Sequence, residues 1–172
     1  MAQPDSRIFV RAYRRRGKLL SRFAHDVELT LTDFEIRVSD GHVNVDFAPA
    51  SLKVHGALVD GRVDASLLDA AKCAEIERNA RRDVLRTERY SGGRFSGRFE
   101  RNGDRVTVEG SLELLGTSRE VQFNLERHGS KFVGTLALEP SRWKIAPYRA
   151  LLGALELQDR VDVMVEVADT QA

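Results

Sequence analysis

Apolar and polar residues alternate along most of this chain. Val27, Leu29 and Leu31 take every second position of one run, and similar runs recur up to the end of the sequence. A period of two is typical of β-strands that bury one face. Turn signals separate the runs, among them Asp40-Gly41, a pair that suits a tight hairpin. About nine such runs, with turns roughly ten residues apart, predict an antiparallel all-β fold.

One stretch, at about residues 69–89, departs from this alternation. Ile76, Ala80 and Val84 fall four residues apart and form one apolar stripe, which is typical of an amphipathic helix. Glutamates dominate the first turns and arginines the last, in agreement with the helix dipole. We therefore expect one helical insertion between the strands.

A long antiparallel sheet must bury one of its faces, and a barrel closed on itself achieves this in a chain of 172 residues. We expect a lipocalin-like β-barrel of about eight strands, built from a single domain of residues 1–172, with the helix as a plug or flank. A barrel of this size is just wide enough for one slender ligand if its inner side chains leave room.

The segment 141–157 has no clean period of two. It holds the only tryptophan, Trp143, together with a proline, a tyrosine and four leucines, and it directly precedes the last strand. Such a segment either fills the core or forms the lid of a pocket, because loops at barrel mouths are where small-molecule sites form. Both interpretations stay open.

The composition is that of an ordinary globular protein, with 42% apolar and 31% charged residues. The formal net charge of +1 provides no strong global field for nucleic acid or an anionic membrane. We expect no nucleic-acid partner, since no aromatic platform accompanies the basic residues. The basic run at 14–18 fits either a solvated turn or a docking point for an acidic head group or partner.

We expect a cytoplasmic protein. The single cysteine, Cys73, excludes an intramolecular disulfide and gives no reason to assume an oxidising compartment. Residues 1–7 carry no apolar core of a secretion signal. No segment approaches the ~20 apolar residues that a membrane-spanning helix needs.

Patterns for catalysis and metal binding are weak. His25, His42, His55 and His128 are scattered, without the spacing of a metal motif. The chain has no nucleophile elbow, phosphate-binding loop or dinucleotide-binding glycine motif. We expect no enzyme, no cofactor and no metal site. His25 fits either a structural hydrogen bond or a contact with a ligand head group.

Several segments, in this order and spacing, carry a family resemblance. Residues 75–78, followed by Val84-Leu85 and Tyr90, look like a helix leading into an aromatic strand. Residues 108–121 are similar to the pattern V-x-G-x-L-x-x-x-G-x-x-R-x-V, and residues 141–155 to a branch with an R-W/F-G-I motif, although Lys144 stands where a glycine is common. Together they resemble the YceI family of lipocalin-like proteins, which is associated with binding polyisoprenoids and related lipids.

The resemblance and the apolar inner faces both imply binding of a long apolar molecule without chemistry. An isoprenoid, an isoprenoid quinone or a fatty-acid derivative would suit, because burial gives ~0.8 kcal/mol per CH₂ before entropy costs. Gly97 and Gly110 on the same faces could leave the space that a chain needs, and a packed interior without a cavity is the competing interpretation. The predicted ligand-binding residues are Val27, Leu29, Leu31, Phe95, Phe99, Leu112, Leu114, Phe123, Trp143, Ile145, Tyr148 and Leu152.

The alternative is a solid barrel that acts as a stress-response or protein-interaction module. It would dock an acidic partner through a basic band on the helix, which otherwise is a solvated face balanced by glutamates. The band consists of Arg78, Arg81, Arg82, Arg86 and Arg89. A homodimer also stays open, since related barrels are often dimers and no residue here fixes an interface.

Overall fold

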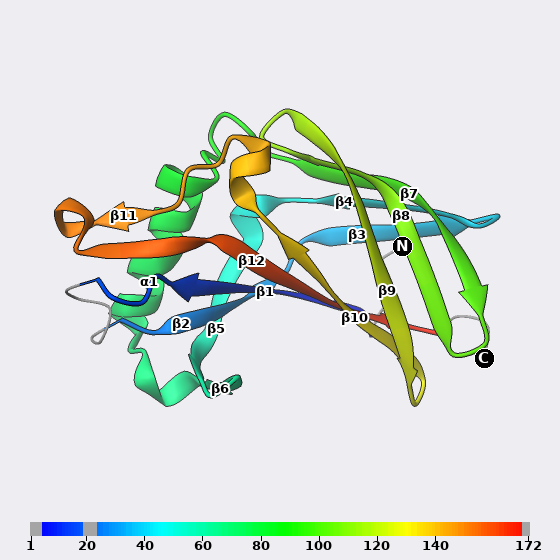
Figure 1. Cartoon of the computed structure of the whole chain (residues 1–172), viewed down its shortest axis with the longest axis horizontal. Helices are drawn as coiled ribbons and strands as arrows, with labels where there is room; N and C mark the ends of the chain where they lie inside the picture. Colours follow the sequence, from blue (N-terminus) through cyan, green and yellow to red (C-terminus); the bar gives the residue numbers. More distant parts are fainter. Residues whose placement is uncertain (1–4, 19–23, 170–172) are drawn as a thin grey trace.

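Twelve antiparallel strands form one curled sheet in the structure, a computed structural model that describes residues 5–18 and 24–169 (Figure 1). The first six are β1 (Arg7–Arg14), β2 (Asp26–Leu31), β3 (Phe34–Ser39), β4 (His42–Phe47), β5 (Leu52–Val59) and β6 (Arg62–Asp64). The others are β7 (Gly93–Asn102), β8 (Arg105–Leu114), β9 (Thr117–His128), β10 (Lys131–Leu138), β11 (Arg149–Ala150) and β12 (Leu155–Ala168). Between β6 and β7 lie the helix α1 (Ala70–Asn79) and a π-helical turn (Ala80–Val84).

The predicted all-β class with one helical insertion is confirmed. The sheet differs from the expected closed barrel of about eight strands, because it has twelve strands and stays open. The strand order is β3-β4-β7-β8-β9-β10-β12-β1-β2-β5-β6, with β11 paired to β12. Within the described residues, no backbone pairing joins the end strands β3 and β6, so the sheet curls without a hydrogen-bonded seam. Part of the excess in strand number comes from the very short β6 and β11, which are too brief to show a period of two.

The helix covers a free edge of this open sheet. β6 pairs with β5 only at Ala57–Val59, which leaves the preceding half of that edge without a strand partner in the described chain. There the Val54 N–H donates to the carboxylate of Glu77 on α1, at 3.0 Å, and the Lys53 ammonium lies 3.1 Å from the same group. Burial raises the pKa of Glu77, but these hydrogen bonds outweigh burial and hold the pKa below its ordinary value.

The helical segment is shorter than the expected 69–89. Asp69 caps α1 by accepting the Lys72 N–H at 2.7 Å, and the π-helical turn ends the segment at Val84. Val84, the last residue of this turn, and Leu85, which follows it, both pack against the core. Arg86 then adopts a left-handed conformation (φ 45°), so the chain leaves the helix before residue 89.

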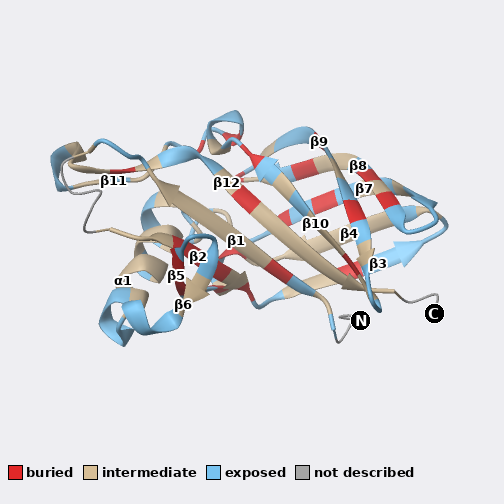
Figure 2. Cartoon of the chain, turned by 60° about the horizontal axis from the view of Figure 1, so that its bottom comes forward, coloured by how far each residue is buried: buried red, intermediate tan, exposed pale blue. Residues whose placement is uncertain are grey.

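Burial follows the predicted period of two most clearly along β7, β8 and β9, whereas β2 is buried on both faces over Val27–Leu29 (Figure 2). The Asp40-Gly41 turn has a positive φ at both residues, as a tight hairpin between β3 and β4 requires. The inward side chains form two core clusters, one centred on β7 to β10 and the other on β1, β2 and β5. The long strands therefore direct one apolar face toward a common interior.

Gly97 and Gly110 do not leave space for a ligand, contrary to the expectation. They lie directly opposite each other in β7 and β8, and the ring of Phe95 covers both. A Cβ atom added at Gly97 would lie 2.7 Å from the Phe95 ring and 2.3 Å from the carbonyl oxygen of Glu109. The two glycines thus allow an aromatic ring and two backbones to approach closely.

We expect Gly97→Ala to destabilise the protein by about 1–3 kcal/mol, because the new methyl group collides with backbone as well as with the ring. Urea denaturation measures the free energy of unfolding. Gly92→Ala is the matched control, since its nearest neighbour would be an ordinary 3.9 Å away. Equal stability of the two variants would contradict the proposed close approach.

Candidate ligand cavity

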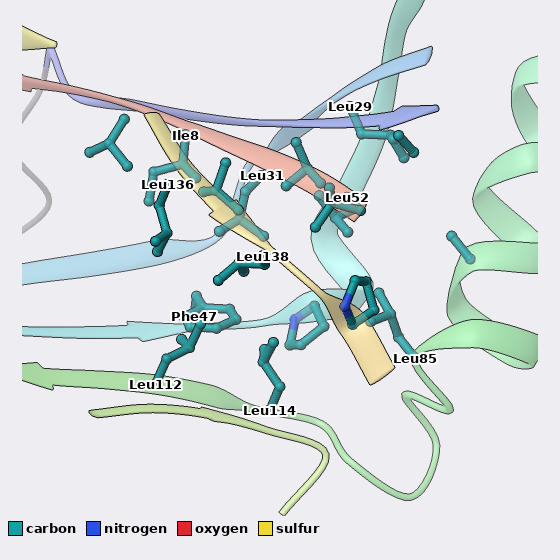
Figure 3. Close-up of a pocket in the computed structure, with 18 of the residues that line it drawn as sticks. Ile8, Leu29, Leu31, Phe47, Leu52, Leu85, Leu112, Leu114, Leu136 and Leu138 are labelled. Atoms are coloured by element: carbon teal, nitrogen blue, oxygen red, sulfur yellow. The ribbon is translucent and has the colours of Figure 1, made fainter. Parts of the chain in front are cut away.

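The interior of the curled sheet contains a cavity of about 990 Å³. Side chains from opposite walls point into it, among them Leu29 and Leu52 on one side and Leu112 and Leu114 on the other (Figure 3). Leu85, which follows the π-helical turn, contributes from the helical side. The wall is therefore built mainly from aliphatic and aromatic side chains, which suit an apolar guest.

The cavity extends along nearly the whole of β12. Leu155, Val161 and Val167, all on one face of that strand, line it. At about 3.3 Å per residue, the stretch from Leu155 to Val167 spans up to about 40 Å. Residues near both ends of β12 thus line the same space, as binding of an extended chain requires.

Eleven of the twelve predicted ligand-binding residues line this cavity. They are Val27, Leu29, Leu31, Phe95, Phe99, Leu112, Leu114, Phe123, Trp143, Ile145 and Tyr148. Whether they touch a ligand stays a prediction. The twelfth, Leu152, does not line the cavity: it adopts a left-handed conformation in a turn, and its side chain is fully exposed to solvent.

Sequence reasoning missed many lining residues on the remaining strands. Examples are Ile8 on β1, Ile36 on β3, Phe47 on β4 and Leu136 on β10. The signal that could have identified them was the same period of two that identified Val27 and its neighbours. The alternation marks the inward face of every strand but does not show which faces share one interior.

The segment that lacks a period of two both fills the core and walls the cavity. Trp143 is completely buried, and its indole N–H donates to the Leu112 carbonyl oxygen at 2.8 Å. Ile145, also buried, lines the cavity beside it. The Tyr148 hydroxyl accepts a hydrogen bond of 3.0 Å from the Asn79 amide, which ties the segment to α1.

Polar side chains gather where the cavity meets α1. His25 is half-buried there, near the start of β2. The polar lining residues at this end are Arg14, His25, Lys72, Glu75, Asn79 and Tyr148. This α1 end could hold a hydrogen-bonding head group while the apolar interior holds a chain.

The opposite end of the cavity carries an ion-pair network. The Asp169 carboxylate lies 3.2 Å from Arg101 and 2.7 Å from Arg127. Both guanidinium groups lie about 5 Å from the centre of the Phe132 ring, at 5.0 and 4.9 Å. The charges at this end are thus engaged with one another and with an aromatic ring.

At the α1 end, Glu156 of β12 forms ion pairs with the segment after β1, at residues 15–18, and with Arg149 of β11. Its buried carboxylate lies 3.0 Å from Arg15, 3.0 Å from Lys18 and 3.3 Å from Arg149. The hydrogen bond from Lys18 lowers the pKa of Glu156 most strongly; burial opposes this shift, and the nearby arginines add to it. The pKa therefore lies below its ordinary value, which keeps the carboxylate charged.

No group of three His, Cys, Asp or Glu side chains in the described part of the chain could hold a metal ion. Of the helices in residues 5–18 and 24–169, none is long and apolar enough to cross a membrane.

A curled antiparallel sheet around an apolar cavity defines a lipocalin-like fold. The family model of the YceI-like domain matches residues 6–168, so the chain belongs to the YceI-like family, as its sequence predicted. No curated protein matches the sequence.

Solved structures show the same fold at low sequence identity. BcnA of Burkholderia cenocepacia superposes with a TM-score of 0.63 at 14% identity, over 94% of each chain. A polyisoprenoid-binding domain from Saccharophagus degradans gives 0.60 at 11% identity, over 96% of this chain and 92% of that one. The YceI protein of Campylobacter jejuni gives 0.50 at 14% identity, over 80% and 82%.

We expect the stability difference between the wild type and Glu156→Gln to depend on pH. A carboxylate whose pKa is lowered by folding stabilises the protein above its unfolded pKa of about 4.3, and this stabilisation is lost as pH falls through the folded pKa. Urea denaturation at neutral and acidic pH should show the variant weaker at neutral pH and equal to the wild type in acid. The exposed Glu113 provides the control variant Glu113→Gln. A difference that is constant with pH would contradict the assigned role of Glu156.

Proposed function

We propose that this protein binds a long apolar molecule inside its sheet and carries or stores it without chemistry. The observation that carries this proposal is the cavity of about 990 Å³, which is apolar and lined by side chains of most long strands. Its volume lies at the upper end of the ~300–1,000 Å³ typical of ligand pockets. The polyisoprenoid-binding function of the Saccharophagus relative supports the same class of ligand.

Burial of the chain supplies the binding free energy. At ~0.8 kcal/mol per CH₂, a chain of about 12 carbons gives a gross ~10 kcal/mol before entropy costs. An isoprenoid, an isoprenoid quinone or a fatty-acid derivative meets this requirement. The lining needs no specific polar contact along the chain, so shape and length would select the ligand.

The ligand's polar head group would lie at the α1 end. Asn79 and Tyr148 are hydrogen-bonded there, and His25 and Arg14 add further polar groups. The opposite end is less suitable, because Asp169 already engages two arginines. This arrangement favours, for His25, the head-group contact over a purely structural hydrogen bond.

The interaction-module alternative has less support. A cavity of this size argues against a solid core. The basic band is also partly neutralised, since Arg81 lies 3.8 Å from Glu77 and Arg82 lies 2.7 Å from Asp83. The cytoplasmic location and the homodimer stay predictions, which cell fractionation and sedimentation velocity would test.

Native mass spectrometry of the freshly purified protein, followed by solvent extraction, tests the proposal. We expect a stoichiometric adduct rich in CH₂ or isoprene units. Val163→Trp should lower the fraction of protein that carries the adduct, because Val163 faces the cavity between Val10 and Leu136 and the larger ring narrows the space there.

Met164→Trp is the matched control for this experiment. Met164 is the next residue of β12 and does not line the cavity, so its variant should keep the adduct. A bare mass for the wild type, unchanged after incubation with quinones and fatty acids, would refute the container function. Equal adduct loss in both variants would show that folding, rather than cavity volume, was affected.

A further inference from the structure

The turn between β11 and β12 exposes two adjacent leucines. Leu151 is 66% exposed and Leu152 is 108% exposed, the highest values among the exposed large hydrophobic residues of the described chain. Both adopt left-handed conformations, with φ values of 52° and 55°, which cost non-glycine residues energy. A strained turn that presents its apolar side chains to water calls for a functional explanation.

Basic residues lie near the base of this leucine tip, which consists of Leu151 and Leu152. Arg149 stands two residues before Leu151 and pairs with Glu156 of β12, and the Arg15 N–H donates to the Glu156 carbonyl oxygen at 2.7 Å, which brings residues 14–18 to the same end of the molecule (Figure 1). Arg16 is exposed and has no carboxylate partner in the part of the chain that the structure describes. The arrangement combines an apolar point with a cationic rim.

The charge balance at the rim is positive. Five cations lie there, namely Arg14, Arg15, Arg16, Lys18 and Arg149. Asp26 and Glu156 are the two carboxylates that pair with them, so five positive charges against two negative ones leave an excess of three. The side chains of Arg15 and Arg149 stay 60% and 65% exposed despite their ion pairs, so they remain accessible to anions in solution.

The leucine tip lies at the α1 end of the cavity. Leu151 itself lines the cavity, as do Arg14 and His25 from the neighbouring segment. Figure 2 shows the turn beyond β11 projecting, largely exposed, from the same end of the molecule as α1. Because the exposed residues Leu151 and Lys72 line the cavity there, the cavity opens to solvent at this end. A lipid that enters or leaves through this opening would therefore pass the two leucines.

We propose that the leucine tip and its basic rim dock this protein on an anionic lipid bilayer, so that the opening of the cavity faces the membrane. The leucines insert among the acyl chains, and the rim cations bind lipid phosphates. A bilayer suits this surface because the leucines form a protruding point rather than a flat patch for a folded partner. The proposal rests on the proposed function for its purpose, which is the loading or release of lipid cargo.

Vesicle flotation tests the docking. We use the full chain with vesicles of phosphatidylcholine alone and of an equimolar mixture of phosphatidylcholine and phosphatidylglycerol. The wild type should bind the anionic vesicles and bind them less as salt rises, because salt screens the rim. Leu152→Ser should weaken this binding roughly tenfold, since it removes one inserted side chain outside the cavity lining.

Leu67→Ser is the matched control, because Leu67 is an exposed leucine, at 44%, in the 3-10 turn before α1 and away from the leucine tip. It should bind vesicles like the wild type. Arg16→Glu should weaken binding to the anionic vesicles while leaving the circular-dichroism spectrum unchanged. Docking is overturned if the wild type binds neither vesicle, or if Leu152→Ser binds as tightly as Leu67→Ser.

The outcomes for docking and for cargo binding are separable. Because Leu152 does not line the cavity, Leu152→Ser should keep any adduct seen by native mass spectrometry. An adduct without vesicle binding would overturn docking and leave the container function intact. Vesicle binding that depends on Leu152, in a protein without any adduct, would support docking and count against the container function.

Discussion

An open sheet edge is the constraint on which this structure depends. A curled sheet whose end strands do not pair must still bury its apolar inner face. It must also provide hydrogen-bond partners for the free edge of β5, the last long strand in the sheet order. Glu77 meets the second requirement by accepting the Val54 N–H, and α1 meets the first by covering the end of the cavity. One carboxylate on one helix thus satisfies part of the edge that the strands leave unpaired.

The sequence predicted the strands, their inward faces and the class of fold, because each depends on local spacing. Val27, Leu29 and Leu31 alternate with polar residues whatever lies opposite them, and eleven predicted residues indeed share one cavity. Whether the sheet closes into a barrel could not be predicted from local spacing. Whether β3 meets β6 depends on contacts between segments that are distant in sequence, which local spacing does not show.

The two errors in the candidate site have the same origin. Gly97 looked like empty space because a glycine has no side chain, but the Phe95 ring two residues earlier occupies that volume. Leu152 looked like a lid residue because it is apolar and follows Tyr148, but its backbone turns the side chain away from the interior. Composition gives the kind of side chain available at a position, whereas its direction depends on backbone angles that the surrounding fold imposes.

The position of β12 has a consequence for how the chain folds during synthesis. This last strand pairs with β10 on one side and with β1 on the other, so Ile8 lies opposite Val165 across almost the whole sequence. Contacts between residues so far apart in sequence slow folding, because a long loop must close before they form. On the ribosome, β1 and β10 therefore wait with open edges until β12 emerges. The nascent chain is exposed to misassembly until that strand is available.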